Sequence, residues 1–284
     1  MFQSISLFGK TTMLYQPITN AAYFVAVILL LLHVKEYKSF CTFPVLVDQR
    51  LFHKSSEAKS RLTILAFLES VLVFALTVVM IFPLNAPLSK LFLGDTSDGY
   101  FPIIYFVPFG LFILGVIMRL TPLKLLDFAA PADCLLLIIV KIACYCEGCC
   151  YGIELASSPF FNHKNERYEF PIQLIEIACA VAMFIVLSIM RKKRKRAGFM
   201  FPAFIVMYCA SRFVFEFWRD DYPDVVGGMN GNQIMSLIGL VFGIILCVGA
   251  AIWGERITTF FDQRNRAFLV ERQKQMHLKR IKKG

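Results

Sequence analysis

Seven apolar segments, each about as long as a lipid bilayer is thick, constrain the fold of this chain more than any other feature. The hydrocarbon core of a bilayer is about 30 Å thick, and a helix needs roughly 20 mostly apolar residues to cross it. Hydrophobic residues make up 57% of the chain, more than the core of a soluble domain requires. The segments are residues 17–34, 62–82, 101–118, 126–145, 171–190, 199–217 and 233–253. The sequence therefore predicts an all-α, polytopic membrane bundle with about seven transmembrane helices.

Basic residues are concentrated in alternate loops between these segments. Six lie in residues 35–61, six form the unbroken run 191–196, and nine lie from Arg256 onward. The loops on the other side hold at most two each. Because cytoplasmic loops are enriched in Lys and Arg, this pattern predicts an N-terminus outside the membrane and a C-terminus in the cytoplasm. The net charge of +10 is then a topology signal, and we expect no nucleic-acid partner.

Two parts of the chain are expected to differ in their surroundings. Residues 1–255 are predicted to form the transmembrane bundle with its outer loops, and residues 256–284 a basic cytoplasmic tail. In the tail, Phe260, Phe261 and Phe268 alternate with basic residues. This alternation is typical of an amphipathic helix that lies along a membrane surface.

Charged and amide side chains gather at a similar depth in the outer half of four predicted helices. They are Lys141, Gln173, Glu176, Arg212, Glu216 and Gln233. A charge inside a bilayer costs several kcal/mol unless it is paired or hydrated, so these residues are candidates for function. Two interpretations remain open: internal salt bridges that hold the bundle together, and a pocket for a lipid phosphate. For the second, Arg212 offers two parallel donors to phosphate oxygens.

Four of the nine cysteines lie close together at the end of the fourth segment. They are Cys144, Cys146, Cys149 and Cys150. Three interpretations stay open: a zinc or cluster site, a disulfide on the oxidising side of the membrane, or small, weakly polar residues at a tight helix end. We favour the third, and therefore predict no metal and no cofactor.

Several short motifs follow one another between the third and seventh segments. They are Asp127-Phe-Ala-Ala-Pro131, Lys141-Ile-Ala-Cys144-Tyr-Cys-Glu147-Gly-Cys149, Pro171-Ile-Gln173-Leu-Ile-Glu176, Tyr208-Cys-Ala-Ser-Arg212-Phe-Val-Phe-Glu216-Phe-Trp-Arg219 and Gln233-Ile-Met-Ser236. In order and spacing they resemble D-x-x-A-P, G-R-x-G-N-F-x-N-G-E, P-x-Q-L-Y-E, Y-x-x-x-R-x-x-x-E-F-x-R and G-Q-x-L-S of the prolipoprotein diacylglyceryl transferase family. The resemblance runs from about the third segment to the seventh, over half of the chain.

The resemblance implies a membrane-embedded transferase of the bacterial inner membrane. Such enzymes move a diacylglyceryl group from phosphatidylglycerol to the thiol of a lipobox cysteine and release glycerol phosphate. Expected partners are phosphatidylglycerol, or a similar anionic phospholipid, and the cysteine of a prolipoprotein signal peptide. The expected catalytic residues are Arg212 and Lys141 on the phosphate, and Glu216, which orients Arg212. The expected substrate-binding residues are Gln173, Glu176, Gln233, Glu147, Cys144, Cys149 and Arg219.

The chain departs from the family's pattern at chemically important positions. The family's H-G-G motif would fall within residues 106–115, which contain no His. Lys141 occupies the position of the Arg in the family's signature. Cys144 and Glu147 occupy the positions of its first and second Asn, and Cys149 that of its Glu. The expected general base is therefore missing. This favours one alternative, a phospholipid-binding or scaffold protein that has lost the chemistry. A second alternative is a transporter, for which the features are the prolines of the third segment and the buried charges.

Overall fold

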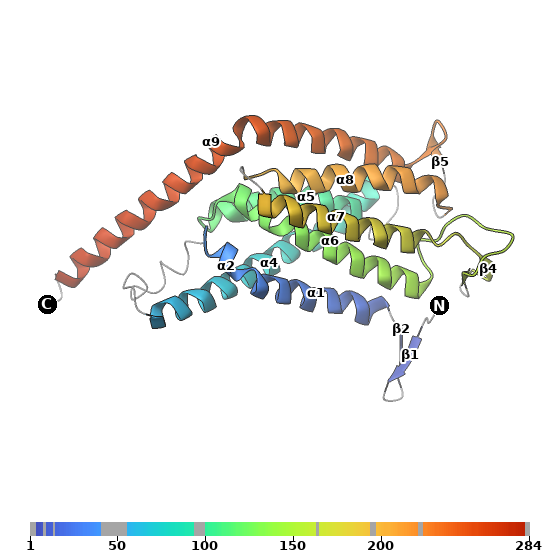
Figure 1. Ribbon diagram of the computed structural model, residues 1–284, viewed down its shortest axis with the longest axis horizontal. Helices are drawn as coiled ribbons and strands as arrows, with labels where there is room; N and C mark the ends of the chain where they lie inside the picture. The colour runs from blue at the N-terminus through green and yellow to red at the C-terminus, as the bar shows by residue number, and fades with distance from the viewer. Residues whose placement is uncertain are drawn as a thin grey trace. The chain divides into compact units, whose positions relative to one another are not determined.

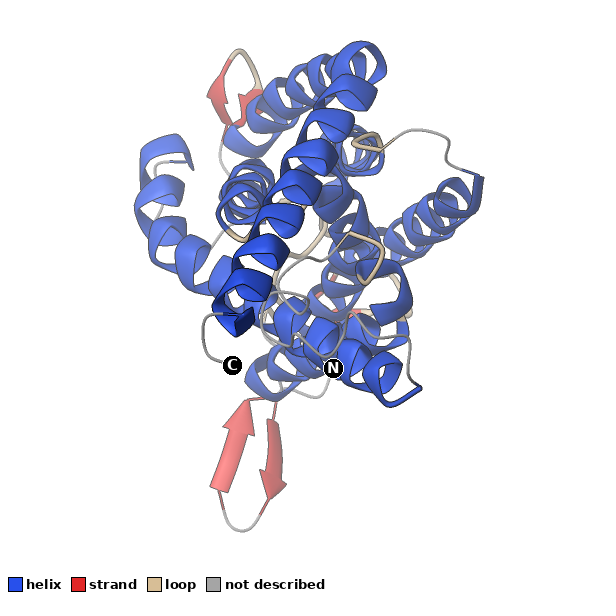
Figure 2. Cartoon of the chain, turned by 90° about the vertical axis from the view of Figure 1, so that its left-hand side faces the viewer, coloured by secondary structure: helices blue, strands red, loops and turns tan. Residues whose placement is uncertain are grey.

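The computed structural model describes residues 4–7, 10–13, 15–40, 56–93, 100–162, 165–193, 197–220 and 224–281. Within these ranges the chain is mainly helical, and strands occur only as short pairs (Figure 2). The helices are α1 (Tyr15–Leu32), α2 (Val34–Tyr37), α4 (Ser56–Leu93), α5 (Tyr100–Ile117), α6 (Pro122–Glu147), α7 (Ile172–Lys193), α8 (Met200–Phe215) and α9 (Gly231–Ile281) (Figure 1). A 3-10 turn, Glu216–Trp218, follows α8.

The strands form three antiparallel pairs. They are β1 (Ser4–Leu7) with β2 (Lys10–Met13), β3 (Phe161–Asn162) with β4 (Arg167–Tyr168), and β5 (Asp224–Val226) with β6 (Met229–Asn230). In the second pair, Phe161 lies opposite Tyr168, and their rings meet edge to face with centroids 5.1 Å apart. These hairpins were not predicted from the sequence.

The predicted all-α class is confirmed, and each of the seven predicted segments falls largely within one helix. Within the described residues, four helical stretches are long and apolar enough to cross a membrane: Ser60–Val79, Ile172–Lys193, Met200–Trp218 and Gly231–Arg272. A shorter apolar helix covers Phe106–Ile117. The number of crossings and the orientation of the termini stay predictions. Residues 41–55, 194–196 and 282–284, which contain part of the predicted basic loops and tail, lie outside the described residues.

The chain divides into two compact units whose boundaries pass through helices. Unit 1 consists of residues 1–28, 130–194 and 202–246, and unit 2 of residues 29–129, 195–201 and 247–284. Four helices, α1, α6, α8 and α9, each contribute residues to both units. The boundary expected between residues 255 and 256 lies inside α9, so the expected bundle and tail share one continuous helix.

In unit 2, α4 packs against α2 and α5. An aromatic cluster joins α2 to α6, because the ring of Tyr37 meets those of Phe40 and Phe128 at centroid distances of 5.0 and 5.5 Å. Asp127, the first residue of the D-x-x-A-P-like motif, is fully buried. Its carboxylate accepts hydrogen bonds from the backbone N–H groups of Gly198 (2.7 Å) and Met200 (2.9 Å). Asp127 therefore caps the N-terminus of α8, where a negative charge is favourable.

Part of the expected cytoplasmic tail packs against other helices of unit 2. Phe261 is buried, and its ring meets that of Phe112 edge to face at 6.0 Å. Lys124 forms a salt bridge with Asp262 at 2.7 Å. Phe260, by contrast, is 61% exposed. The tail is helical as expected, and its contact with a membrane surface stays a prediction.

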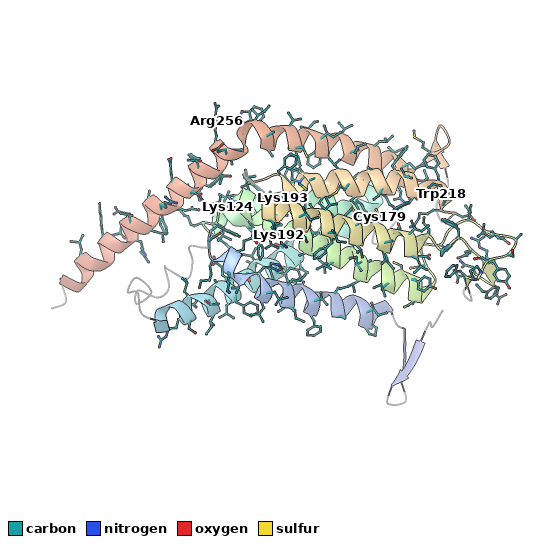
Figure 3. All side chains as sticks on the ribbon, viewed as in Figure 1. Lys124, Cys179, Lys192, Lys193, Trp218 and Arg256 are labelled. Carbon is teal, nitrogen blue, oxygen red and sulfur yellow. The ribbon has the colours of Figure 1, made fainter. Side chains whose placement is uncertain are left out.

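In unit 1, α7 and α8 lie side by side, joined by the contact between Glu176 and Arg212. One end of this pair carries basic residues, and the other carries the buried polar side chains. Figure 3 shows Lys192 and Lys193 at one end of α7 and Trp218 near the opposite end of the pair. The buried side chains between them are apolar, among them Leu187 and Phe204. The polar side chains that were expected to form a site lie at the Trp218 end.

Candidate functional site

Glu176 is the centre of a buried ionic cluster built from three helices and the turn after α8. One carboxylate oxygen accepts from Arg212 Nη1 at 2.6 Å and lies 3.4 Å from Arg219 Nη1. The other lies 2.7 Å from Lys141 Nζ. These four residues are all less than 10% exposed. Charges removed from water in this way are stable only when they are paired, as they are here.

Glu216 extends the cluster toward the start of α9. Its carboxylate lies 3.2 Å from Arg212 Nη2, four residues earlier on the same face. The side-chain amides of Asn230 and Asn232 donate to its other oxygen at 3.3 and 3.1 Å. Arg219 Nε approaches to 3.8 Å.

The cluster carries more positive charge than negative. The cations of Lys141, Arg212 and Arg219 face two carboxylates, those of Glu176 and Glu216, which leaves a surplus of one positive charge. Arg212 Nε is buried and has no hydrogen-bond partner among the described residues. A buried guanidinium donor without an acceptor costs free energy, so an anion that fills this position would be stabilised.

A capping box places Asn232 against Glu216. Asn230 precedes α9, and its side-chain oxygen accepts from the backbone N–H of Gln233 at 2.9 Å. The side-chain oxygen of Gln233 accepts in return from the backbone N–H of Asn230 at 3.0 Å. This exchange satisfies two donors at the helix start and fixes the direction in which α9 begins.

The cysteines lie on a tight turn that ends α6. Gly148 has a positive φ of 72°, and the N–H of Cys149 donates to the carbonyl of Cys144 at 3.2 Å. This is the hydrogen bond of a Schellman motif, in which the side chains at these two positions meet. Cys150 also has a positive φ, 56°. The sulfur atoms of Cys144, Cys149 and Cys150 all lie within 4.8 Å of one another.

Electrostatics at this turn favour a thiolate. The pKa of Cys150 is held well below its usual range by hydrogen bonds that its sulfur accepts from Cys144 and Cys149. The positive charges of Lys141 and Arg219 lower this pKa further. Burial opposes this shift, because it penalises the charged form. The turn is thus a group of thiols in a locally positive environment.

Neighbouring residues hold the cysteine turn by its backbone. The side-chain amide of Gln173 donates to the carbonyl of Cys149 at 2.8 Å. That of Asn162 donates to the carbonyl of Gly148 at 3.1 Å and to Glu169 at 2.7 Å. The turn is therefore anchored from both α7 and the β3–β4 hairpin.

The chain after the turn passes between two other segments of backbone. Ile153 donates to the carbonyl of Trp218 at 3.0 Å and accepts from the N–H of Phe170 at 2.9 Å. A Cβ on Gly152 would collide with the carbonyl oxygens of Phe170 and Trp218. Glycine is required there because two backbones approach closely.

A second ionic group lies at the surface of unit 1 and is separate from the buried cluster. Arg167 donates to Glu169 at 2.8 Å and to Asp220 at 3.2 Å, and its guanidinium lies 4.9 Å from the ring centroid of Tyr151. The hydrogen bond with Glu169 raises the pKa of Arg167 above its ordinary value. This group ties the hairpin to the segment that follows α8.

The structure brings together five of the ten predicted site residues: Lys141, Glu176, Arg212, Glu216 and Arg219. Cys144 and Cys149 lie in the cysteine turn, which Gln173 holds, and Gln233 belongs to the capping box. Glu147 is half-buried in the last turn of α6. The catalytic and binding roles of all ten stay predictions.

Three residues were not among the ten predicted site residues, although Cys150 was named in the cluster of cysteines. Asn230 and Asn232 pair with Glu216, and Cys150 completes the group of three thiols. The pattern N-x-x-Q before an apolar run signals a capping box, so the position of Asn230 at the helix start could have been predicted from the sequence. The grouping of the thiols depends on the positive φ angles of the turn, which the sequence suggests only at Gly148.

Comparison with known proteins identifies the family. The sequence profile of the prolipoprotein diacylglyceryl transferase family matches residues 103–249, which include every residue of the ionic cluster and of the cysteine turn. The chain belongs to this family. The membership predicted from the motifs is therefore confirmed.

Curated relatives carry the family's name in full. A phosphatidylglycerol–prolipoprotein diacylglyceryl transferase of Clostridium tetani is 26% identical over 132 residues, which cover 44% of this chain and 52% of the relative. Similar enzymes of Clostridium perfringens (28% over 130 residues; 44% and 51%) and Tropheryma whipplei (25% over 148 residues; 48% and 54%) also match. The matched region spans about half the length of these prolipoprotein diacylglyceryl transferases.

Proposed function

We propose that this chain is a membrane-embedded diacylglyceryl transferase that uses phosphatidylglycerol and a prolipoprotein. The diacylglyceryl group would pass to the cysteine thiol of the signal peptide at the outer leaflet of the bacterial inner membrane. Family membership and the names of the relatives support this activity. Helices long and apolar enough to cross a membrane support its location.

One observation carries the proposal for the site: a buried ionic cluster with a surplus positive charge and an unpaired donor on Arg212. The bond between the glycerol carbon and the phosphate oxygen breaks during transfer, so negative charge develops on the leaving phosphate. Arg212 and Lys141 would stabilise that charge. Glu216 would keep the guanidinium of Arg212 in place, since the two are already in contact at 3.2 Å.

A transfer assay tests both the activity and the role of Arg212. The full-length protein is reconstituted into vesicles that contain phosphatidylglycerol, a lipobox peptide is added, and mass spectrometry measures the diacylglyceryl adduct. We expect transfer by the wild type and at least a tenfold loss in Arg212→Lys, because Lys keeps the charge and loses the two parallel donors. Arg167→Lys is the matched control, as Arg167 pairs outside the cluster, and its rate should change less than twofold.

Two results would contradict the proposal in different ways. Absence of an adduct in the wild type would remove the transferase activity. Equal rates for wild type and Arg212→Lys would remove the role assigned to Arg212.

A second candidate function is phospholipid binding without transfer. Residues 106–115, where the family's H-G-G motif would fall, contain no His, and this favours it. Native mass spectrometry in detergent separates the two candidates. A retained phosphatidylglycerol that Arg212→Lys loses, without any peptide adduct in the assay above, would support the binding protein. The gathering of the cations at one site supports either candidate over a transporter, in which charges would line a path.

A further inference from the structure

The three thiols of the cysteine turn have the arrangement of a metal-binding site. Sulfur atoms bound to one tetrahedral zinc ion lie about 3.8 Å apart, because each zinc–sulfur bond is about 2.3 Å long. The sulfurs of Cys144, Cys149 and Cys150 lie within 4.8 Å of one another. Small side-chain rotations would bring them to bonding distance of a single ion.

The backbone conformation of the cysteine turn brings the three sulfur atoms together. The Schellman hydrogen bond sets Cys149 against Cys144, and the left-handed conformation of Cys150 returns its side chain toward them. A residue other than glycine or asparagine in this conformation costs about 1–2 kcal/mol. Such strain persists where the surroundings fix it, and here Gln173 and Asn162 hold the two carbonyl groups just before Cys150, those of Cys149 and Gly148.

The electrostatic surroundings also suit a thiolate site. Three thiolates and a zinc ion carry a net charge of −1. Lys141 lies three residues before Cys144, one turn of α6 away on the same face. The backbone of Arg219 pairs with that of Gly152, two residues after Cys150. Two cations of the ionic cluster, Lys141 and Arg219, thus stand close to the turn, and nearby positive charge favours the thiolate form of its cysteines.

We propose that Cys144, Cys149 and Cys150 bind one zinc ion, and that its fourth coordination position takes the cysteine thiol of the acceptor peptide. Zinc sites with three protein ligands keep a fourth position open, whereas closed structural sites use four. This part of the proposal rests on the transferase activity proposed above. It supplies the step for which the chain lacks the expected histidine.

The proposed step balances without a redox change. On binding zinc, the acceptor thiol loses its proton to water, because zinc stabilises the thiolate. The thiolate sulfur attacks the glycerol carbon of phosphatidylglycerol that carries the phosphate. A carbon–sulfur bond forms, the carbon–oxygen bond breaks, and glycerol phosphate leaves with the bonding electron pair. Zinc remains divalent throughout.

Metal content tests the site independently of activity. The full-length protein is purified in detergent under reducing conditions with zinc in the growth medium, and plasma mass spectrometry measures bound zinc. We expect about one zinc per chain in the wild type and at least a tenfold weaker affinity in Cys149→Ser and Cys150→Ser. Cys146→Ser is the matched control, since Cys146 lies on the same turn of α6 and outside the group, and it should keep the zinc.

Cobalt substitution provides a second measurement on the folded wild type. Co²⁺ replaces zinc after chelation, and its thiolate absorption bands report the sulfur ligands. Addition of a lipobox peptide should strengthen these bands, whereas a peptide with Ser in place of the lipobox cysteine should not. Equal thermal unfolding of the variants and the wild type excludes misfolding as the cause of any zinc loss.

Each outcome decides one part of the proposal. Absence of stoichiometric zinc in the wild type, equal loss in Cys146→Ser, or a disulfide among the three cysteines in the native protein would overturn the metal site. The proposed transferase activity would then still stand on its own assay. Bound cobalt with a spectrum that the cysteine peptide leaves unchanged would overturn the fourth-ligand step. Bound zinc without any lipid transfer would instead contradict the proposed function and leave the site intact.

Discussion

At the scale of single residues, Glu176 is a buried carboxylate that contacts three cations. Its carboxylate meets Arg212, Lys141 and Arg219, and only 6% of its side chain is exposed. Removing one partner from a buried ion pair leaves the other charge without compensation. Glu176 should therefore matter for stability whether or not it touches a substrate.

Replacement of Glu176 by Gln tests this claim. The change keeps the shape of the side chain and raises the net charge of the cluster from +1 to +2. We expect a loss of about 3–5 kcal/mol in unfolding free energy. Thermal and denaturant unfolding in detergent would measure it.

Glu154→Gln is the control for that experiment. Glu154 also pairs with an arginine, Arg167, but the distance is 3.7 Å and 65% of its side chain is exposed. A pair of this kind contributes at most about 1 kcal/mol. Similar small losses in both variants would mean that the buried cluster is not a source of stability.

The charged residues of the site could be predicted from the sequence. The positions of its uncharged residues, Asn232 and Cys150, could be predicted only to a small extent. Arg212 and Glu216 are four residues apart at the end of one predicted helix, so they share one of its faces. The predicted directions of the helices place Glu176, near the start of another, at a similar depth. The contact of Asn232 with Glu216 depends on how α9 is capped. The conformation of Cys150 depends on a turn that its residue type disfavours.

At the scale of elements, α9 approaches α8 closely at a glycine. A Cβ on Gly243 would lie 2.8 Å from Val206 Cγ2 and 3.2 Å from the backbone nitrogen of Val206. Gly249, also in α9, would place its Cβ no closer than 3.9 Å to Trp253 Cε3. The same substitution in the same helix therefore meets crowded space at one position and only an ordinary van der Waals contact at the other.

Alanine at these two positions should have opposite effects. Within a helix, Ala is more favourable than Gly by about 0.8–1.0 kcal/mol. Gly249→Ala should therefore raise the melting temperature slightly. Gly243→Ala should lower it, because overpacking costs typically about 1–3 kcal/mol. Equal shifts of the same sign in differential scanning fluorimetry would show that α8 and α9 are not in close contact there.

Hydropathy located the helices better than it located their ends. It predicted a segment over 62–82, whereas α4 covers Ser56–Leu93, and 233–253, whereas α9 continues to Ile281. A hydropathy window detects lipid-compatible residues and stops where charges begin, although the helix can continue in water. The hairpin strands have two to four residues each, too few for an alternating pattern to be recognised.

At the scale of the whole molecule, the charge distribution predicts which ends of the helices face the cytoplasm. The basic residues at the end of α7 and the site at its opposite end belong to the same unit. If the basic end is cytoplasmic, the ionic cluster faces the outer side of the membrane.

Reporter fusions test this orientation in cells. Alkaline phosphatase inserted at Ser157, an exposed residue beyond the cysteine turn, should be active. The same enzyme fused after Gly284 should be inactive, and a fluorescent protein there should fold. Neutral replacements of the basic run 191–196 should weaken this difference. The reverse pattern of activities would contradict the predicted topology.

Helix α6 carries Lys141 of the ionic cluster and Cys144 of the cysteine turn only three residues apart. Three residues of helix correspond to about 4.5 Å along the axis. The separation between a bound phosphate and an activated sulfur would be set by this fixed spacing rather than by loop motion. Insertion of one alanine between the two residues would rotate one site by about 100° relative to the other. The attacking sulfur and the leaving phosphate oxygen would then no longer lie in line on opposite sides of the glycerol carbon, although no side chain had been changed.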